Sequence, residues 1–162
     1  MNVKTKAAAS EPKEFVKWTD KLACGVKLID DQHKGLVNLI NEMFDHVSGN
    51  FTQEKDYFNR VIQEAVKYIK VHFADEERIM IATKFAGYPE HKKEHELFIK
   101  TTLENIKDYE AGKRFTLSSF TRFLKDWVLS HVALVDKKYF DYFKSIATRK
   151  DDGKLTINLH EL

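Results

Sequence analysis

The sequence contains little cysteine, proline and glycine, and each scarcity excludes a class of protein. Among 162 residues there are one cysteine, two prolines and six glycines. A single thiol, Cys24, excludes an intramolecular disulfide framework and a cysteine-based zinc site. The scarcity of turn-forming residues disfavours a many-stranded sheet and favours helices. The chain is nevertheless long enough to bury the core of one ordinary domain.

Long apolar runs and an excess of one charge are also missing. No segment approaches the roughly 18 apolar residues that a membrane span needs, and the first 15 residues lack the apolar region of a signal peptide. The formal net charge is only +2, from 27 basic and 25 acidic side chains. Such a balance indicates neither a nucleic-acid partner nor an anionic membrane. We therefore expect a cytoplasmic protein that binds no nucleic acid and no membrane.

Apolar residues recur at spacings of three and four in four long segments, which predicts four helices. The expected helices span about 30–47, 52–85, 89–111 and 117–146. Gly49, Gly87 and Gly112 fall at the breaks, and Pro89 suits a first helical turn. Short connections favour antiparallel neighbours, so we predict an all-α, up-down-up-down four-helix bundle. The expected divisions are an N-terminal arm at 1–17, the bundle at 18–147 and a C-terminal tail at 148–162.

Polar side chains interrupt the apolar stripe of every predicted helix. In chain order they are His33, His72, Glu76, His91, His95, His131 and Asp136. Residues four apart share a helix face, so His91 and His95 could bind one ion together. The five-residue step from His131 to Asp136 turns about 140° around an α-helix. That rotation suits a carboxylate that reaches past one ion toward a second.

A single histidine on an apolar face is more often a satisfied core residue than a metal ligand, and each short motif can arise by chance. Five histidines and two carboxylates in phase with four stripes are different, because burying them without partners costs several kcal/mol each. Imidazoles suit zinc, copper, iron or nickel, and bridging carboxylates favour a redox-active pair such as iron. Two six-coordinate ions need about twelve donor positions. These side chains and one bridging hydroxide leave one position open for a diatomic ligand.

These residues and their neighbours resemble the hemerythrin family, particularly its stand-alone bacterial members. The resemblance runs from Trp18 to Tyr142 and is carried by Trp18, Gly25-Val26, Ile29-Asp30-x-Gln32-His33, His72-Phe73-x-x-Glu76-Glu77, Met80, His91-x-x-x-His95, Phe98 and Trp127-x-x-x-His131-x-x-x-x-Asp136. It implies two iron ions with a bridging oxo or hydroxo group, and reversible dioxygen binding without catalysis. His91, His95 and His131 would hold the saturated iron. His33 and His72 would hold the iron with the open position, and Glu76 and Asp136 would bridge the two.

Side chains beside the ligands would complete the site. Four apolar residues are expected to wall a dry ligand pocket: Leu36, Phe73, Trp127 and Val132. Dryness would slow proton delivery and loss of the bound ligand, although simple core packing is an equal alternative. We interpret Glu77 as a solvated neighbour of Glu76. Tyr139 is either a core tyrosine or a hydrogen-bond partner of the site, and His46 and His160 lie off the pattern.

Two other function classes stay open. A di-iron oxidase or peroxidase of the ferritin-like type uses Glu-x-x-His pairs, and no such pair occurs in this sequence. A slow activity of this kind could still accompany a histidine-rich centre. Alternatively, the protein could sense dioxygen, nitric oxide or iron, or bind peroxide, and signal to a separate protein that the sequence does not identify.

Overall fold

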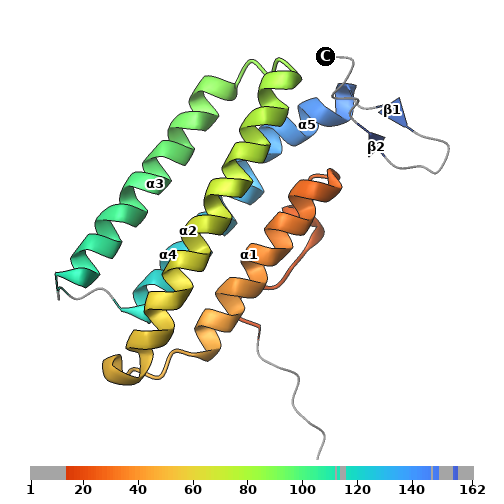
Figure 1. Cartoon of the computed structure of the whole chain (residues 1–162). Helices are drawn as coiled ribbons and strands as arrows, with labels where there is room; N and C mark the ends of the chain where they lie inside the picture. The colour runs from red at the N-terminus through yellow and green to blue at the C-terminus, as the bar shows by residue number, and fades with distance from the viewer. Residues whose placement is uncertain (1–13, 112, 114–115, 147, 150–154, 157–162) are drawn as a thin grey trace, which may run out of the picture.

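Four long helical segments, here called rods, lie side by side in the computed structural model (Figure 1). The structure describes residues 14–111, 113, 116–146, 148–149 and 155–156. The first three rods are α1 (Lys27–Asp45), α2 (Phe51–Ala82) and α3 (Tyr88–Glu110). The fourth comprises α4 (Leu117–Ser130), a π-helical segment η2 (His131–Val135) and α5 (Lys137–Ile146). The predicted all-α four-helix bundle is confirmed.

Short elements flank the bundle. A 3-10 helix, η1 (Asp20–Leu22), precedes α1, and strands β1 (Thr148–Arg149) and β2 (Leu155–Thr156) follow α5 as an antiparallel pair. His160 and most of the predicted arm and tail lie outside the described residues, so that division stays a prediction. Among the described helices, none combines the length and the apolar character that crossing a bilayer requires.

Side-chain caps fix the helix ends near the predicted breaks. The Asn50 side chain accepts hydrogen bonds from the backbone N–H groups of Thr52 and Gln53 at the start of α2. Thr116 caps α4 in the same way through the N–H of Ser119. These caps matter because the first N–H groups of a helix have no partner within it. Pro89 occupies the first turn of α3, as predicted.

The core consists of two apolar clusters with a polar layer between them. Along α2, Phe73 belongs to the larger cluster and Met80 to the smaller one, with Glu76 between them. Along the fourth rod, Val132 and Tyr139 likewise lie on either side of Asp136. The polar layer is therefore closed off by packed apolar side chains at both ends.

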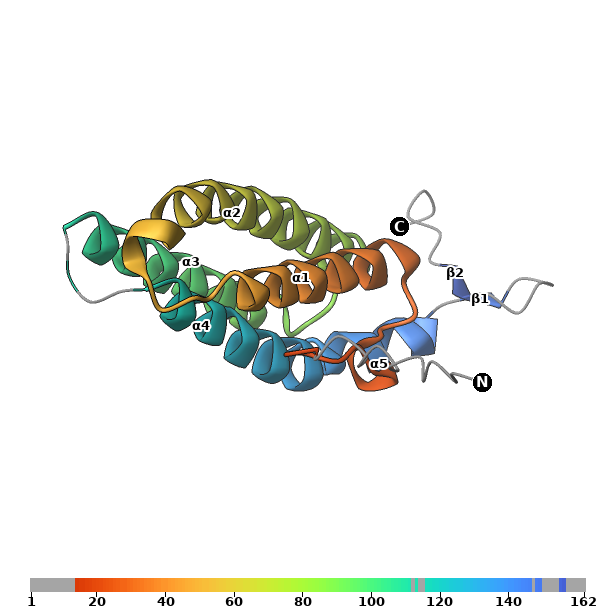
Figure 2. The same cartoon turned by 90° about the horizontal axis from the view of Figure 1, so that it is seen from below.

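The segment before η1 packs against the bundle. The Val16 N–H donates to the Asn41 side chain over 2.8 Å, and the Asn41 amide donates back to the Val16 carbonyl over 2.9 Å. Phe15 stacks on Phe44 with ring centroids 4.1 Å apart, and the Lys125 ammonium lies over the same Phe15 ring. Figure 2 shows this segment, drawn in red, beside the last rod. It fastens the C-terminal end of α1 to α4.

The fourth rod is not the single regular α-helix that the sequence predicts. The Asp136 N–H donates to the His131 carbonyl over 3.0 Å, an i to i+5 bond that widens the helix locally. The expected rotation of about 140° assumed α-helical geometry. The wider turn instead brings Asp136 Oδ1 within 3.0 Å of His131 Nε2. Both side chains thus reach the same polar layer.

We predict that Asn50→Ala lowers the free energy of unfolding by about 1 kcal/mol, because two N–H groups of α2 lose their acceptor. Urea denaturation monitored by circular dichroism measures the change. Asn59→Ala is the matched control, since Asn59 is exposed within the same helix and alanine is the better helix former there. Equal stability of the two variants would contradict the assigned cap.

Candidate metal centre

Seven metal-capable side chains from all four rods meet within the polar layer. They are His33, His72, Glu76, His91, His95, His131 and Asp136, and each is between 0% and 4% exposed. In two overlapping groups the donor atoms lie within 4.8 Å of one another. The first group contains Glu76, His91, His95 and His131, and the second contains His33, His72 and Glu76. The structure therefore brings together every ligand position that the sequence analysis selected.

Glu76 lies between the two sets of histidines and turns one oxygen toward each. Its Oε1 is 3.7 Å from His33 Nε2 and 3.5 Å from His72 Nε2. Its Oε2 is 3.7 Å from His91 Nε2 and 3.2 Å from His95 Nε2. A carboxylate divided in this way can bridge two neighbouring ions.

Asp136 repeats the arrangement from the opposite helix. Its Oδ2 is 3.5 Å from His33 Nε2, whereas Oδ1 is 3.5 Å from His91 Nε2 and 3.0 Å from His131 Nε2. The two carboxylates thus define the same pair of positions. One position is surrounded by His33 and His72, and the other by the remaining three histidines.

Hydrogen bonds on the outer side of the imidazoles set their orientation. The Nδ1–H of His72 donates to the Gln32 side-chain carbonyl over 3.0 Å, and His33 Nδ1 lies 3.3 Å from the Leu22 carbonyl. Gln32 in turn donates its amide to Asp75 over 2.6 Å. When Nδ1 carries the proton, the lone pair of Nε2 faces the centre. The sequence analysis missed these roles, although Gln32 belongs to the motif beside His33.

Glu77 orients a third imidazole, and its interpretation as a solvated neighbour is wrong. Its Oε1 lies 3.2 Å from His95 Nδ1, and its other oxygen accepts a hydrogen bond from Tyr88. Lys92 lies 3.9 Å away, and the Glu77 side chain is only 21% exposed. Glu77 follows Glu76 by one residue and therefore points about 100° away from it, toward α3. Its partner, His95, lies on α3, so the pair becomes evident only when α2 and α3 are placed together.

The inner atoms fit metal ions because they have no other partner. Six buried atoms make no hydrogen bond: the Nε2 atoms of His33, His72 and His131, Oε2 of Glu76, and both oxygens of Asp136. Leaving such groups unpaired costs about 1–3 kcal/mol each, and more if they are charged. His91 Nε2 and His95 Nε2 lie 3.0 Å apart, a distance at which two lone pairs repel unless a cation or proton stands between them. Mixed imidazole and carboxylate donors suit a first-row transition metal such as iron.

The electrostatics of the layer favour an ionised carboxylate. Burial alone would raise the pKa of Glu76, but the charge of His72 and the close approach of His33, His91 and His95 hold it well below its usual value. Burial lowers the pKa of His72 to about 4. Burial also opposes the charge of His33, yet the nearby carboxylates of Asp136 and Glu76 outweigh it and raise its pKa to about 9. The Glu76 charge is therefore available to balance cations.

Tyr139 fixes the orientation of Glu76. It is fully buried, and its hydroxyl donates a hydrogen bond to Glu76 Oε1. Burial raises the pKa of the phenol well above its usual value, so the hydroxyl keeps its proton and remains a donor. Its ring also meets His91 edge-on, with centroids 5.3 Å apart. Tyr139 is thus both a core residue and a hydrogen-bond partner of the site.

The four expected pocket residues all belong to the larger apolar cluster or pack against it. Phe73 stacks on His95 with centroids 3.7 Å apart, and Trp127 stacks on His131 at 4.5 Å. Leu36 and Val132 are completely buried in the larger apolar cluster. Two of the four residues therefore cover imidazole faces. Their role as walls of a ligand pocket stays a prediction.

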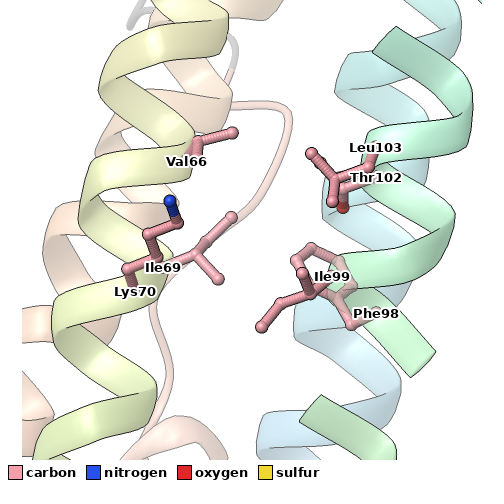
Figure 3. Close-up of a pocket in the computed structure, with 7 residues that line it drawn as sticks. All are labelled: Val66, Ile69, Lys70, Phe98, Ile99, Thr102 and Leu103. Atoms are coloured by element: carbon pink, nitrogen blue, oxygen red, sulfur yellow. The ribbon is translucent and has the colours of Figure 1, made fainter. Parts of the chain in front are cut away.

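An apolar slot of about 70 Å³ lies between α2 and α3, next to Phe98 (Figure 3). It is lined by Val66, Ile69, Lys70, Phe98, Ile99, Thr102 and Leu103. None of the seven metal-capable residues lines it. Phe98 meets Phe73 edge-on with centroids 5.9 Å apart, so aromatic rings lie between the slot and His95.

Comparisons with known proteins agree with this geometry. Residues 24–143 match the model of the hemerythrin HHE cation binding domain. The chain is 35% identical over 124 residues to a bacteriohemerythrin of Pseudomonas aeruginosa, covering 76% of this chain and 78% of that protein. It is 29% identical over 123 residues to a myohemerythrin of Sipunculus nudus, covering 75% and 88%. A crystal structure of wild-type hemerythrin superposes with a TM-score of 0.69 at 28% identity, covering 78% of this chain and 96% of that one.

We predict that Tyr139→Phe releases bound metal to a chelator at least about tenfold faster, because outer hydrogen bonds to ligands typically contribute this much to metal retention. Metal release is followed by the absorbance of the chelate. Tyr142→Phe is the control, since Tyr142 donates to the Thr83 carbonyl outside the centre. Equal release from both variants would show that the bond to Glu76 does not hold the metal.

Proposed function

The chain belongs to the hemerythrin family, and from that premise we propose that it binds dioxygen reversibly at a pair of iron ions. The observation that carries the proposal is the orientation of the Glu76 carboxylate, whose two oxygens face different sets of histidines. The Asp136 carboxylate is oriented in the same way. Two carboxylates shared in this way support a pair of ions rather than one.

The two ion positions differ in the number of protein donors. The first has four: Nε2 of His33 and His72, Oε1 of Glu76 and Oδ2 of Asp136. The second has five: Nε2 of His91, His95 and His131, Oε2 of Glu76 and Oδ1 of Asp136. With a shared oxo or hydroxo bridge, an octahedral preference would be satisfied at the second position alone. The open coordination position would therefore lie on the side of His33 and His72.

When bound, a ferrous pair supplies two electrons and one open coordination position, which allow a diatomic ligand to bind without a net reaction. The protein supplies orientation and dryness. Tyr139 holds Glu76, while Gln32 and Glu77 hold two imidazoles. The apolar clusters on both sides of the layer exclude water and so slow the proton transfer that would consume the ligand. This environment supports a carrier or storage role rather than an enzymatic one.

The spectrum of the iron-loaded protein tests this proposal. The protein is reduced without air, exposed to dioxygen and returned to low oxygen, with iron counted per chain. We expect two irons and a visible absorption band that appears and disappears over repeated cycles. Permanent oxidation with consumption of dioxygen would favour an oxidase or peroxidase instead. Preferential binding of nitric oxide would favour a sensor.

We predict that His131→Ala or Glu76→Ala abolishes loading with two irons, because each change removes donors from the centre. Iron per chain is measured after reconstitution and removal of unbound metal. His46→Ala is the control, since His46 is exposed and stacks on Tyr57 away from the centre. Full loading of either centre variant would count heavily against the assignment.

A further inference from the structure

From a hollow at the start of α3, we infer a port through which hydrated ferrous ions reach the metal centre. The hollow has a volume of about 270 Å³ and is lined by Phe85, Gly87, Glu90, His91, Glu94, Val135 and Lys138. The inference rests on the proposed function, because it takes the loaded metal to be iron. Its subject is the route of loading, which the arrangement of the ligands alone does not explain.

A route is needed because the ligands are closed off. All seven are at least 96% buried, so an ion cannot approach them directly from solvent. His91 is one of the seven, and it also lines the hollow. Its Nε2 lies 3.5 Å from Asp136 Oδ1 and 3.7 Å from Glu76 Oε2. A single imidazole therefore connects the hollow to both bridging carboxylates.

The size of the hollow suits a hydrated ion. Each water molecule takes up about 30 Å³ in the liquid, so the hollow has room for an ion with several waters. A small, doubly charged ion gives up its waters reluctantly, because the cost of desolvation is high. A hollow that carries two carboxylates and ends on His91 allows these waters to be exchanged for protein donors at His91 itself.

The charges at the rim favour a cation. Glu90 and Glu94 lie one turn apart on α3, on either side of His91 in sequence, and both are exposed. Neither carboxylate forms an ion pair within 4.0 Å among the described residues. Lys138, on the opposite wall, compensates only one of the two negative charges. Unpaired carboxylates at a concave mouth attract cations and raise their rate of association.

The slot between α2 and α3 lacks both the volume and the carboxylates of the hollow (Figure 3). Its volume is about 70 Å³, its only charged side chain is Lys70, and its walls are otherwise formed mainly by apolar side chains. A ferrous ion would have to lose its waters there and then pass the rings of Phe98 and Phe73. The hollow beside His91 presents neither obstacle.

Stopped-flow loading of the metal-free chain with ferrous ions, without air, tests the port. Quenching of Trp127, which stacks on His131, reports arrival of the metal. We expect the double variant Glu90→Gln and Glu94→Gln to load at least about threefold more slowly, and Lys138→Gln to load faster. Both effects should shrink at high salt, because salt screens exposed charges. Final iron content should remain two per chain in each variant.

The matched control is the double variant Glu96→Gln and Glu104→Gln, which removes two exposed carboxylates from another face of the same helix. It should load at the wild-type rate. The port is overturned if the Glu90 and Glu94 variant loads as fast as this control. It is also overturned if the wild-type rate does not depend on ferrous concentration, because opening of the bundle would then limit loading. Failure of the wild type to take up any iron would overturn the proposed function and the port with it.

Discussion

Glu76 and Asp136 are buried side by side in the middle of a helical bundle, and the rest of the structure is arranged around that constraint. Two unpartnered carboxylates at such a position would be among the most costly groups a fold could contain. Here five imidazoles turn their Nε2 atoms toward them, and cations between the two sets would satisfy both. The binding energy of the ions is then coupled to the stability of the folded chain.

The outer hydrogen bonds and the apolar clusters make this arrangement specific. An imidazole that is free to rotate could pair directly with a carboxylate and compete with a metal. Gln32 and Glu77 prevent that rotation at His72 and His95 by accepting from Nδ1. Phe73 stacks on His95, and Trp127 stacks on His131, so packing and hydrogen bonding together restrain the imidazoles. The orientation of the imidazoles is thus set by residues outside the set of seven metal-capable side chains.

One feature of the sequence, the phase of polar residues within apolar stripes, predicted both the helices and the seven metal-capable side chains. Phase depends on an assumed helical period, and this explains where the prediction was wrong. The π-helical turn at His131 departs from the α-helical period, so the expected rotation to Asp136 did not hold. Glu77 was misread because its partner, His95, belongs to another helix. The contact between Glu77 and His95 cannot be found from spacing along one segment, since it depends on how α2 and α3 pack.

Dryness and accessibility make opposite demands on such a centre. Dioxygen is small and uncharged, so side-chain fluctuations on the nanosecond scale can admit it through a packed interior at little cost. A ferrous ion carries a charge and bound waters, and the same apolar packing opposes its entry. Under the proposed function, the clusters that enclose the layer could therefore remain closed to solvent, provided that the carboxylates of the hollow lead the cation to His91. The position of His91, buried toward the carboxylates yet lining a hollow with Glu90 and Glu94, meets both demands without opening the core.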